Sequence, residues 1–276
     1  MKHNKYEEIY KLVDNNIATL LTGPAGSSKS TTAEQVIEAL GLKFYEMTMT
    51  KQTTVSAILG FVSINGNYIP TLFREAYENG GGFLKNEIDA ADVNVLLCFN
   101  SIENGYISFP DKLVRAHKDF RLIATANPQS QHNIYTGRSK LDASTLDRFE
   151  TVEVDRDEAL ELFLTSKQTY KEVTKARSIL RSSGASNEIT MRDAIRLERK
   201  RHLGLKDGPY ESLFKEEDHY AKKEFLDWIQ AEKENSISIQ DAKDIDQLWS
   251  IMKRRLDEQE KEKIANDFAE RMEVPF

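Results

Sequence analysis

The sequence predicts an α/β fold with a parallel sheet between two layers of helices, followed by a mainly helical second part. Short apolar runs at residues 17–21, 44–47 and 120–126 predict buried strands, and segments with helical periodicity separate them. Strands that alternate with helices are typical of a parallel sheet covered on both faces. Strand signals fade after residue 154, so we expect an α/β domain over residues 1–155 and helices beyond it.

Each element follows from a local pattern. Apolar residues at helical spacing predict a first helix over residues 6–13, and residues 31–37 repeat that spacing after the first strand. Three glycines precede a further strand at Phe83 and Leu84. Two hairpins are expected, one at residues 61–69 around Asn65-Gly66 and a shorter one at residues 105–110.

Composition excludes several classes of protein. The 276 residues are 39% hydrophobic and 30% charged, which is enough to bury a core. Neither a membrane helix nor a signal peptide is visible, so we expect a soluble cytoplasmic protein. One cysteine, Cys98, excludes an internal disulfide and supplies too few sulfurs for a zinc site. The net charge of −7 does not favour binding to nucleic acid or to a membrane surface.

The segment GPAGSSKS lies between the first strand and the first helix that follows it, which is the context of a phosphate-binding loop. Lys29 is expected to reach the β- and γ-phosphates and Ser30 to bind Mg²⁺. The usual pattern has glycine where Ser28 stands, and serine is tolerated there if its backbone φ stays negative. The alternative is a turn that caps an ordinary helix. The expected phosphate contacts are Gly23, Pro24, Ala25, Gly26, Ser27, Ser28, Lys29, Ser30 and Thr31.

The segment GGFLKNEIDAAD predicts a strand that ends in a metal-facing residue and a catalytic glutamate. Asn86 stands where an aspartate would orient Mg²⁺, so it offers an oxygen to the metal but no charge. Glu87 is placed to orient or deprotonate an attacking water. Lys85 is unexpected in a central strand, which should be apolar. The alternative is that Asn86 and Glu87 cap the next helix.

Asn127 ends another predicted strand, in the segment ATANP. A polar amide at the carboxyl edge of the sheet would lie near the γ-phosphate, so Asn127 is a candidate for positioning water and phosphate. The alternative is an ordinary Asn-Pro turn. Its order along the chain, after the loop and the glutamate, favours the phosphate-positioning role.

These segments, together with LDASTLDRFE, occur in the order of Walker A, Walker B, sensor 1 and arginine finger in AAA+ ATPases. The sequence resembles the dynein-related subfamily, close to the MoxR and cobaltochelatase-small-subunit-like proteins, from about Ile17 to Arg192. The resemblance implies an AAA+ P-loop NTPase core over residues 1–155, a helical lid over 156–203 and a helical C-terminal extension over 204–276. The hairpins match inserts that line the pore of the ring in this subfamily.

The resemblance also implies ATP and Mg²⁺ as cofactors and a ring, usually of six subunits. Arg148 resembles the finger that reaches the γ-phosphate of the neighbouring subunit, and Arg138 is a second interface candidate. Arg192 resembles the sensor-2 arginine of the lid. Taken singly, each arginine could instead form a surface salt bridge. The residues expected to act in catalysis are Glu87, Asn127, Arg148 and Arg192.

Three functions compete. The leading hypothesis is an ATPase that remodels a protein client, with slow hydrolysis because Asn86 lacks a charge. The second is an ATP-gated scaffold with weak or no hydrolysis, which the residues Ser28, Lys85 and Asn86 favour. The third, a DNA-engaging AAA+ protein, is disfavoured by the acidic balance. Relatives of this kind often work beside a protein with a von Willebrand factor A domain, which makes such a partner an expectation.

Overall fold

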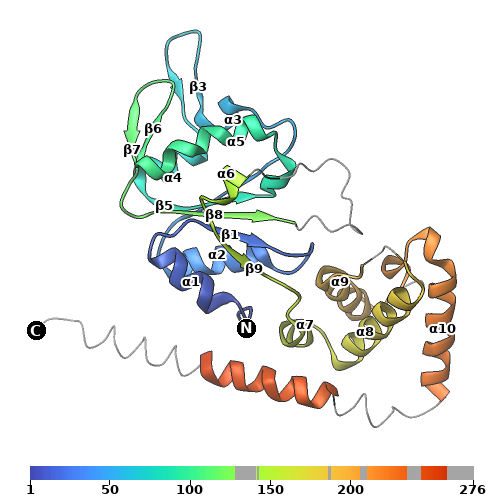
Figure 1. The fold of residues 1–276 in the computed structure, drawn as a ribbon. Helices are drawn as coiled ribbons and strands as arrows, with labels where there is room; N and C mark the ends of the chain where they lie inside the picture. Colours follow the sequence, from blue (N-terminus) through green and yellow to red (C-terminus); the bar gives the residue numbers. More distant parts are fainter. Residues whose placement is uncertain (128–140, 142, 186–187, 206–209, 235–243, 260–276) are drawn as a thin grey trace, which may run out of the picture. The chain divides into compact units, whose positions relative to one another are not determined.

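The computed structural model describes all residues except 128–140, 142, 186–187, 206–209, 235–243 and 260–276. The chain divides into two compact units, one of Asn4–Asp155 and one of Arg156–Phe276 with Met1–His3. The first, the sheet unit, is built around five parallel strands, and the second, the helical unit, consists of helices (Figure 1). The predicted α/β class with a helical second part is therefore confirmed.

The sheet unit holds nine strands and several short helices among its described residues. The strands are β1 (Thr19–Thr22), β2 (Phe44–Thr48), β3 (Phe61–Val62), β4 (Tyr68–Ile69), β5 (Gly81–Asn86), β6 (Tyr106–Ser108), β7 (Leu113–Arg115), β8 (Phe120–Ala126) and β9 (Glu150–Glu153). The helices are α1 (Tyr6–Asp14), α2 (Lys29–Ala39), α3 (Val55–Leu59), α4 (Leu72–Asn79), η1 (Ile88–Ala90), α5 (Val93–Leu96), η2 (Leu97–Asn104) and α6 (Ala143–Leu146).

The main sheet has the strand order β2-β5-β8-β1-β9, and all its neighbouring pairs are parallel. The carboxyl ends of parallel strands meet at one edge of a sheet, where α/β proteins bind ligands. The segments that follow β1, β5 and β8 therefore share this edge. They carry the predicted phosphate loop, Glu87 and Asn127.

Both faces of the sheet are covered by apolar side chains, because neighbouring strand residues point to opposite faces. Leu21, Leu84 and Ile123 belong to a core with α1 and α2, whereas their neighbours Leu20, Phe83 and Leu122 belong to a core with α4 and η2. Figure 1 shows α1 and α2 on one side of the sheet and α4 and α5 on the other. This double burial explains why the strands read as continuous apolar runs.

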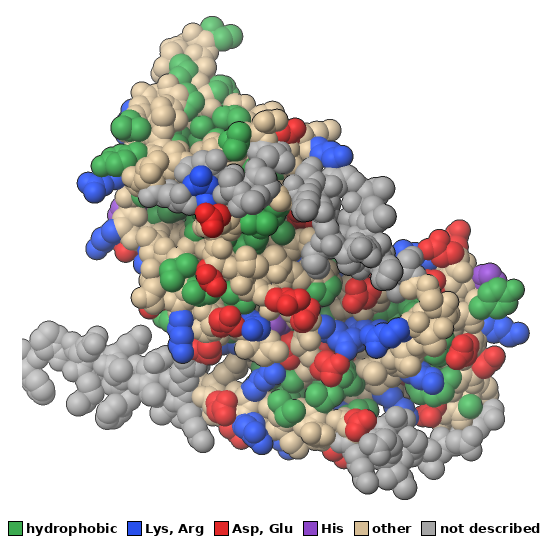
Figure 2. Space-filling view, in the orientation of Figure 1, with side chains coloured by type: hydrophobic (Ala, Val, Ile, Leu, Met, Phe, Trp, Pro, Cys, Tyr) green, Lys and Arg blue, Asp and Glu red, His purple; other side chains and the backbone are tan. Residues whose placement is uncertain are grey.

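Two antiparallel hairpins project from the sheet unit, as predicted. β3 pairs with β4 around Asn65-Gly66, where Gly66 has a φ of 78°, and β6 pairs with β7. The first hairpin is rich in exposed apolar side chains, and Figure 2 shows hydrophobic atoms along this projection. The exposed apolar residues in and beside the two hairpins are Phe61, Val62, Ile64, Ile69, Leu72, Tyr106 and Leu113.

The helical unit contains α7 (Glu158–Leu164), α8 (Lys167–Ser182), α9 (Met191–His202), η3 (Glu211–Leu213), η4 (Glu216–Asp218), α10 (His219–Glu234) and helical residues 244–259. Ser166 caps α8, and Thr190 forms a capping box with Asp193 at the start of α9. Side chains from both sides of residue 203, including Val173, Leu197 and Phe225, form one hydrophobic cluster. None of the described helices is long and apolar enough to cross a membrane.

Lys85 is a buried charged residue within a strand of the main sheet. It lies on β5 and is only 3% exposed, and its Nζ lies 4.1 Å from the ring centroid of Phe99 and 4.8 Å from that of Phe149. Burial lowers the pKa of Lys85 from 10.5 to about 7, whereas the electrostatic interaction with Cys98 acts to raise this pKa. The cation–π contacts offset part of the cost of burying the charge.

Replacing Lys85 with Met is expected to stabilise the protein below pH 7 and to lose that advantage at higher pH. Below pH 7 the folded and unfolded chains both keep the proton, so the cost of the buried charge is fully present. Between the folded value near 7 and the unfolded value of 10.5, only the unfolded chain stays protonated, so the wild type gains stability as the pH rises.

Thermal unfolding of wild type and Lys85→Met at pH 6 and pH 9.5 measures this difference, which we expect to be a few kcal/mol at pH 6. Lys118→Met, at an exposed lysine of the same unit, is the matched control. A stabilisation of equal size at both pH values would show that Lys85 keeps its ordinary pKa.

Candidate functional site

The predicted phosphate-binding loop lies between β1 and α2. Gly23 has a φ of 157°, and a Cβ there would lie 2.1 Å from the carbonyl oxygen of Val154. Only glycine fits that approach. Ser28 makes no side-chain cap hydrogen bond at the start of α2. The N-terminus of such a helix favours an anion.

Ser28 corrects one expectation from the sequence. Its φ is 69° and its ψ is 19°, which is the left-handed region and not the negative φ that a serine there was expected to keep. A residue with a Cβ pays about 1–2 kcal/mol in this conformation. The loop therefore imposes the glycine conformation on a serine, and the strain lies at the edge of the sheet where function is expected.

Lys29 and Asn127 come together at this edge. The Lys29 Nζ donates hydrogen bonds to the carbonyl oxygens of Gly23 (2.7 Å) and Pro24 (2.8 Å) and to Asn127 Oδ1 (3.1 Å). Both side chains are 8% exposed. The Lys29 ammonium, enclosed by a loop at a helix N-terminus, suits the binding of a polyphosphate. Asn127 lies at hydrogen-bonding distance from this ammonium.

Asn86 is the centre of a hydrogen-bond network. Its Oδ1 accepts from Ser30 Oγ at 3.0 Å and from Thr125 Oγ1. Its Nδ2 donates to Glu46 Oε1 at 3.0 Å. The two residues predicted to face Mg²⁺, Ser30 and Asn86, are therefore in direct contact. Hydroxyl, amide and carboxylate oxygens are the donors that Mg²⁺ prefers, so the residues present fit this ion.

Glu87 follows Asn86 in a strained conformation. Its φ is 57° and its ψ is 48°, and its backbone N–H donates to Thr125 Oγ1 at 2.9 Å. Glu87 precedes η1 without a side-chain cap hydrogen bond, and the Asn86 side chain bonds to other elements. Glu87 therefore occupies the N-cap position of η1, as the alternative has it, but no side-chain cap hydrogen bond accompanies that position. Strain of this kind is concentrated at functional sites.

Two of the three predicted arginines, Arg148 and Arg192, lie among the described residues, one in each unit. Arg148 is half-buried and lines an open hollow of about 620 Å³ with Leu97, Ser101 and Ser108, which belong to η2 and β6. Arg192 is exposed in the first turn of α9, in the helical unit. Arg138 lies outside the described residues.

Two residues of the network were missed by the sequence reasoning. Glu46 is a charged residue inside the apolar run of β2, and Thr125 is a hydroxyl residue inside the apolar run of β8. In each case a polar residue interrupts an apolar strand segment, which is a local signal, but the partner of Glu46 is set by the pairing of β2 with β5. No group of three or more His, Cys, Asp or Glu residues that could hold a metal occurs in the described part of the chain.

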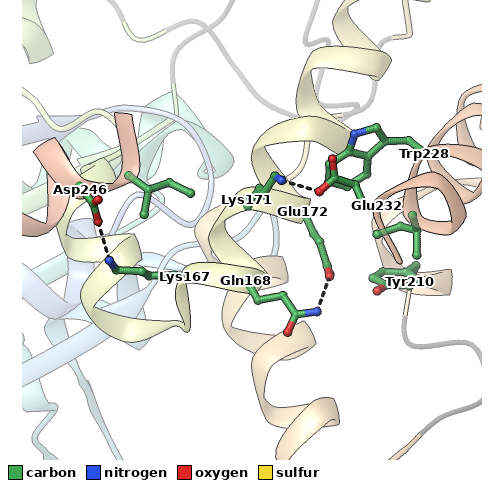
Figure 3. Close-up of a pocket in the computed structure, with 10 residues that line it drawn as sticks. Lys167, Gln168, Lys171, Glu172, Tyr210, Trp228, Glu232 and Asp246 are labelled. Atoms are coloured by element: carbon green, nitrogen blue, oxygen red, sulfur yellow. Dashed lines mark hydrogen bonds and ion pairs between the residues drawn. The ribbon is translucent and has the colours of Figure 1, made fainter. Parts of the chain in front are cut away.

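A separate cavity of about 500 Å³ lies within the helical unit. Figure 3 shows its lining by Tyr210, Trp228 and other residues of α8, α10 and the helical segment 244–259. Two ion pairs lie along its wall, Lys167 with Asp246 at 2.7 Å and Lys171 with Glu232 at 2.5 Å. It contains none of the residues predicted for the phosphate site.

Residues 18–149 match the family model described as the AAA domain of the dynein-related subfamily. A similar curated relative is Midasin of Dictyostelium discoideum, 27% identical over 164 residues. That match covers 55% of this chain and 3% of the relative, so the chain spans a small part of Midasin's length. The predicted resemblance to dynein-related AAA+ ATPases is confirmed for this segment.

Solved structures of NtrX from Brucella abortus are also similar. One covers 71% of this chain and 45% of its own, with 16% identity and a TM-score of 0.46. The other, NtrX in complex with ADP, covers 75% of this chain and 50% of its own, with 15% identity and a TM-score of 0.48. The chain thus spans about half the length of each.

Replacing Ser28 with Gly is expected to raise the free energy of unfolding by about 1 kcal/mol, because relief of the left-handed strain exceeds the added freedom of the unfolded chain. Ser27→Gly is the matched control. Ser27 is 1% exposed and is not among the residues with positive φ, so its replacement should destabilise the protein. Denaturant unfolding measures both variants, and a loss of stability in Ser28→Gly would contradict the assignment of strain to this residue.

Proposed function

We propose that this protein hydrolyses ATP in a ring-shaped oligomer and remodels a protein client. The proposal starts from the match of residues 18–149 to the AAA domain of the dynein-related subfamily. One observation carries the proposal. Lys29, Asn127, Ser30 and Asn86 form two hydrogen-bonded clusters at the carboxyl edge of one sheet, and Glu87 follows directly. This combination of groups is suited to phosphoryl transfer to water.

Each residue of the edge has a distinct role in this proposal. Lys29 neutralises charge on the β- and γ-phosphates, and Asn127 positions the γ-phosphate and the attacking water. Ser30 and Asn86 would hold Mg²⁺, which would neutralise negative charge on the phosphates. Glu87 orients the water and accepts its proton. The strained backbone of Glu87, fixed through Thr125, supports a carboxylate held in one position.

Completion of the site by a neighbouring subunit is part of the proposal. Arg148 shares its hollow with residues of η2 and β6 and with none of the phosphate loop. An arginine in that position suits a role in trans at the γ-phosphate of the next subunit in a hexamer. Arg138 and Arg192 are proposed as a second interface residue and as the sensor of the helical lid.

The hairpins are the proposed contacts with the client. Ile64 is fully exposed at the end of the first hairpin, and Phe61 and Leu113 are more than half exposed. Exposed apolar side chains on projecting loops suit the binding of a protein segment. A partner with a von Willebrand factor A domain, the closeness to MoxR proteins and a cytoplasmic location stay predictions from the sequence.

The second candidate function is an ATP-gated scaffold with little turnover. The observation that favours it is the uncharged Asn86 at the expected metal-facing position. Loss of one positioned group that stabilises developing charge costs about two to three powers of ten in rate. ATP binding would persist in a scaffold, because Lys29 and the loop are intact.

Replacing Glu87 with Gln is expected to lower Mg²⁺-dependent ATP hydrolysis at least a hundredfold while ATP binding persists, because the amide cannot accept a proton from water. Hydrolysis and binding are measured side by side over a range of protein concentrations. A wild-type rate per subunit that rises with concentration supports a site completed by a neighbour. If the wild type binds ATP and shows no turnover at any concentration, the scaffold is the better description.

Replacing Arg148 with Ala is expected to abolish hydrolysis and to spare ATP binding. Mixing Arg148→Ala subunits with Glu87→Gln subunits tests action in trans. An interface is intact when the Arg148→Ala subunit provides the nucleotide site and the Glu87→Gln subunit provides the arginine, so part of the activity should reappear. Lack of recovery in hexamers shown to be mixed would place Arg148 outside the catalytic interface.

A further inference from the structure

The metal-facing part of the site lacks a carboxylate at its expected position. Protein sites for Mg²⁺ next to nucleotide phosphates normally use one or two carboxylates together with the phosphates. Asn86 contributes an amide, and Ser30 contributes a hydroxyl. The proposed function therefore leaves open which residue supplies the negative charge on the protein side.

Glu46 brings a carboxylate to Asn86 from the neighbouring strand. Its Oε1 accepts the hydrogen bond from Asn86 Nδ2 at 3.0 Å. The register explains the contact, since β2 runs parallel to β5 with Glu46 beside Leu84 and Thr48 beside Asn86. Glu46 and Asn86 are thus diagonal neighbours on one face of the sheet, a spacing that a long side chain spans.

The orientation of the Asn86 amide is fixed by its other partners. Ser30 Oγ and Thr125 Oγ1 both donate to Asn86 Oδ1, and Thr125 Oγ1 itself receives the N–H of Glu87. The amide nitrogen must therefore face β2. An amide at this position holds Glu46 by a hydrogen bond, whereas an aspartate would repel it.

We propose that Glu46 supplies the carboxylate of the Mg²⁺ site and that Asn86 positions this carboxylate. The acidic residue of the site then lies on β2 and not at the end of β5. The inference rests on the proposed function, because the phosphates of a bound nucleotide complete the ligand set. Glu46 is exposed, which keeps its carboxylate accessible to a hydrated ion. Mg²⁺ keeps several waters in such sites, so one carboxylate in addition to the Ser30 hydroxyl is a sufficient set of protein ligands.

Glu46→Gln is the first test, because it removes the charge and retains an oxygen that accepts the hydrogen bond of Asn86. Glu38→Gln, at an exposed glutamate of α2, is the matched control. The readout is Mn²⁺ binding to the protein–ATP complex by electron paramagnetic resonance, together with ATP affinity in EDTA. We expect Glu46→Gln to weaken Mn²⁺ binding about tenfold or more and to leave the metal-free ATP affinity unchanged.

The exchange variant Glu46→Gln with Asn86→Asp returns the carboxylate to β5. We expect it to recover most of the Mn²⁺ affinity that Glu46→Gln loses, a result that a purely structural contact between Glu46 and Asn86 would not produce. Equal Mn²⁺ affinity in wild type and Glu46→Gln, or no recovery in the exchange variant, would overturn the inference while ATP binding stands. Absence of ATP binding to the wild type would instead overturn the proposed function, and this inference with it.

Discussion

The hydrogen bonds of the Asn86 side chain join the elements that make up the carboxyl edge of the sheet. Through one amide, β5 is tied to α2 by Ser30, to β8 by Thr125 and to β2 by Glu46. Backbone pairing already sets the spacing of these strands, but it does not fix where polar side chains point. The amide does so, because its one oxygen and one NH₂ group have different partners. A shift of any of these elements breaks at least one of these bonds.

Backbone strain is concentrated at the same edge. Ser28 and Glu87 are two of the three non-glycine residues with positive φ in the described part of the chain; Ser28 directly precedes Lys29, and Glu87 directly follows Asn86. Such conformations persist only when the surrounding structure enforces them. At Glu87 the contact is the bond from its N–H to Thr125 Oγ1, and at Ser28 the carbonyl oxygen accepts hydrogen bonds from the N–H and the Oγ1 of Thr32. The rigidity that holds the strain also holds Lys29 and Glu87 in place.

The sequence predicts the strands and the loop well because these depend on local patterns. Buried strands read as apolar runs; Asn127 directly follows β8, and the loop that leads to Lys29 directly follows β1. Boundaries are less certain, as Ile17 belongs to the apolar run but is 43% exposed and lies before β1. Glu46 was missed because its role depends on the pairing of β2 with β5, which no local pattern encodes. The prediction of a negative φ for Ser28 was wrong, because the loop imposes a conformation that serine does not prefer.

The charges around β5 bear on the choice between motor and scaffold. Asn86 removes a negative charge from the edge, while Lys85 places a cation on the opposite face of the same strand, among Phe99 and Phe149. Asn86 contacts the loop through Ser30 Oγ, but neither change touches Lys29, whose Nζ keeps its hydrogen bonds to the carbonyl oxygens of Gly23 and Pro24. A carboxylate supplied by Glu46 sits on a longer and more exposed side chain than an aspartate at the end of β5. Its freedom costs entropy when the metal binds, which weakens the metal site without removing it. That combination favours tight ATP binding with slow turnover over a complete loss of hydrolysis.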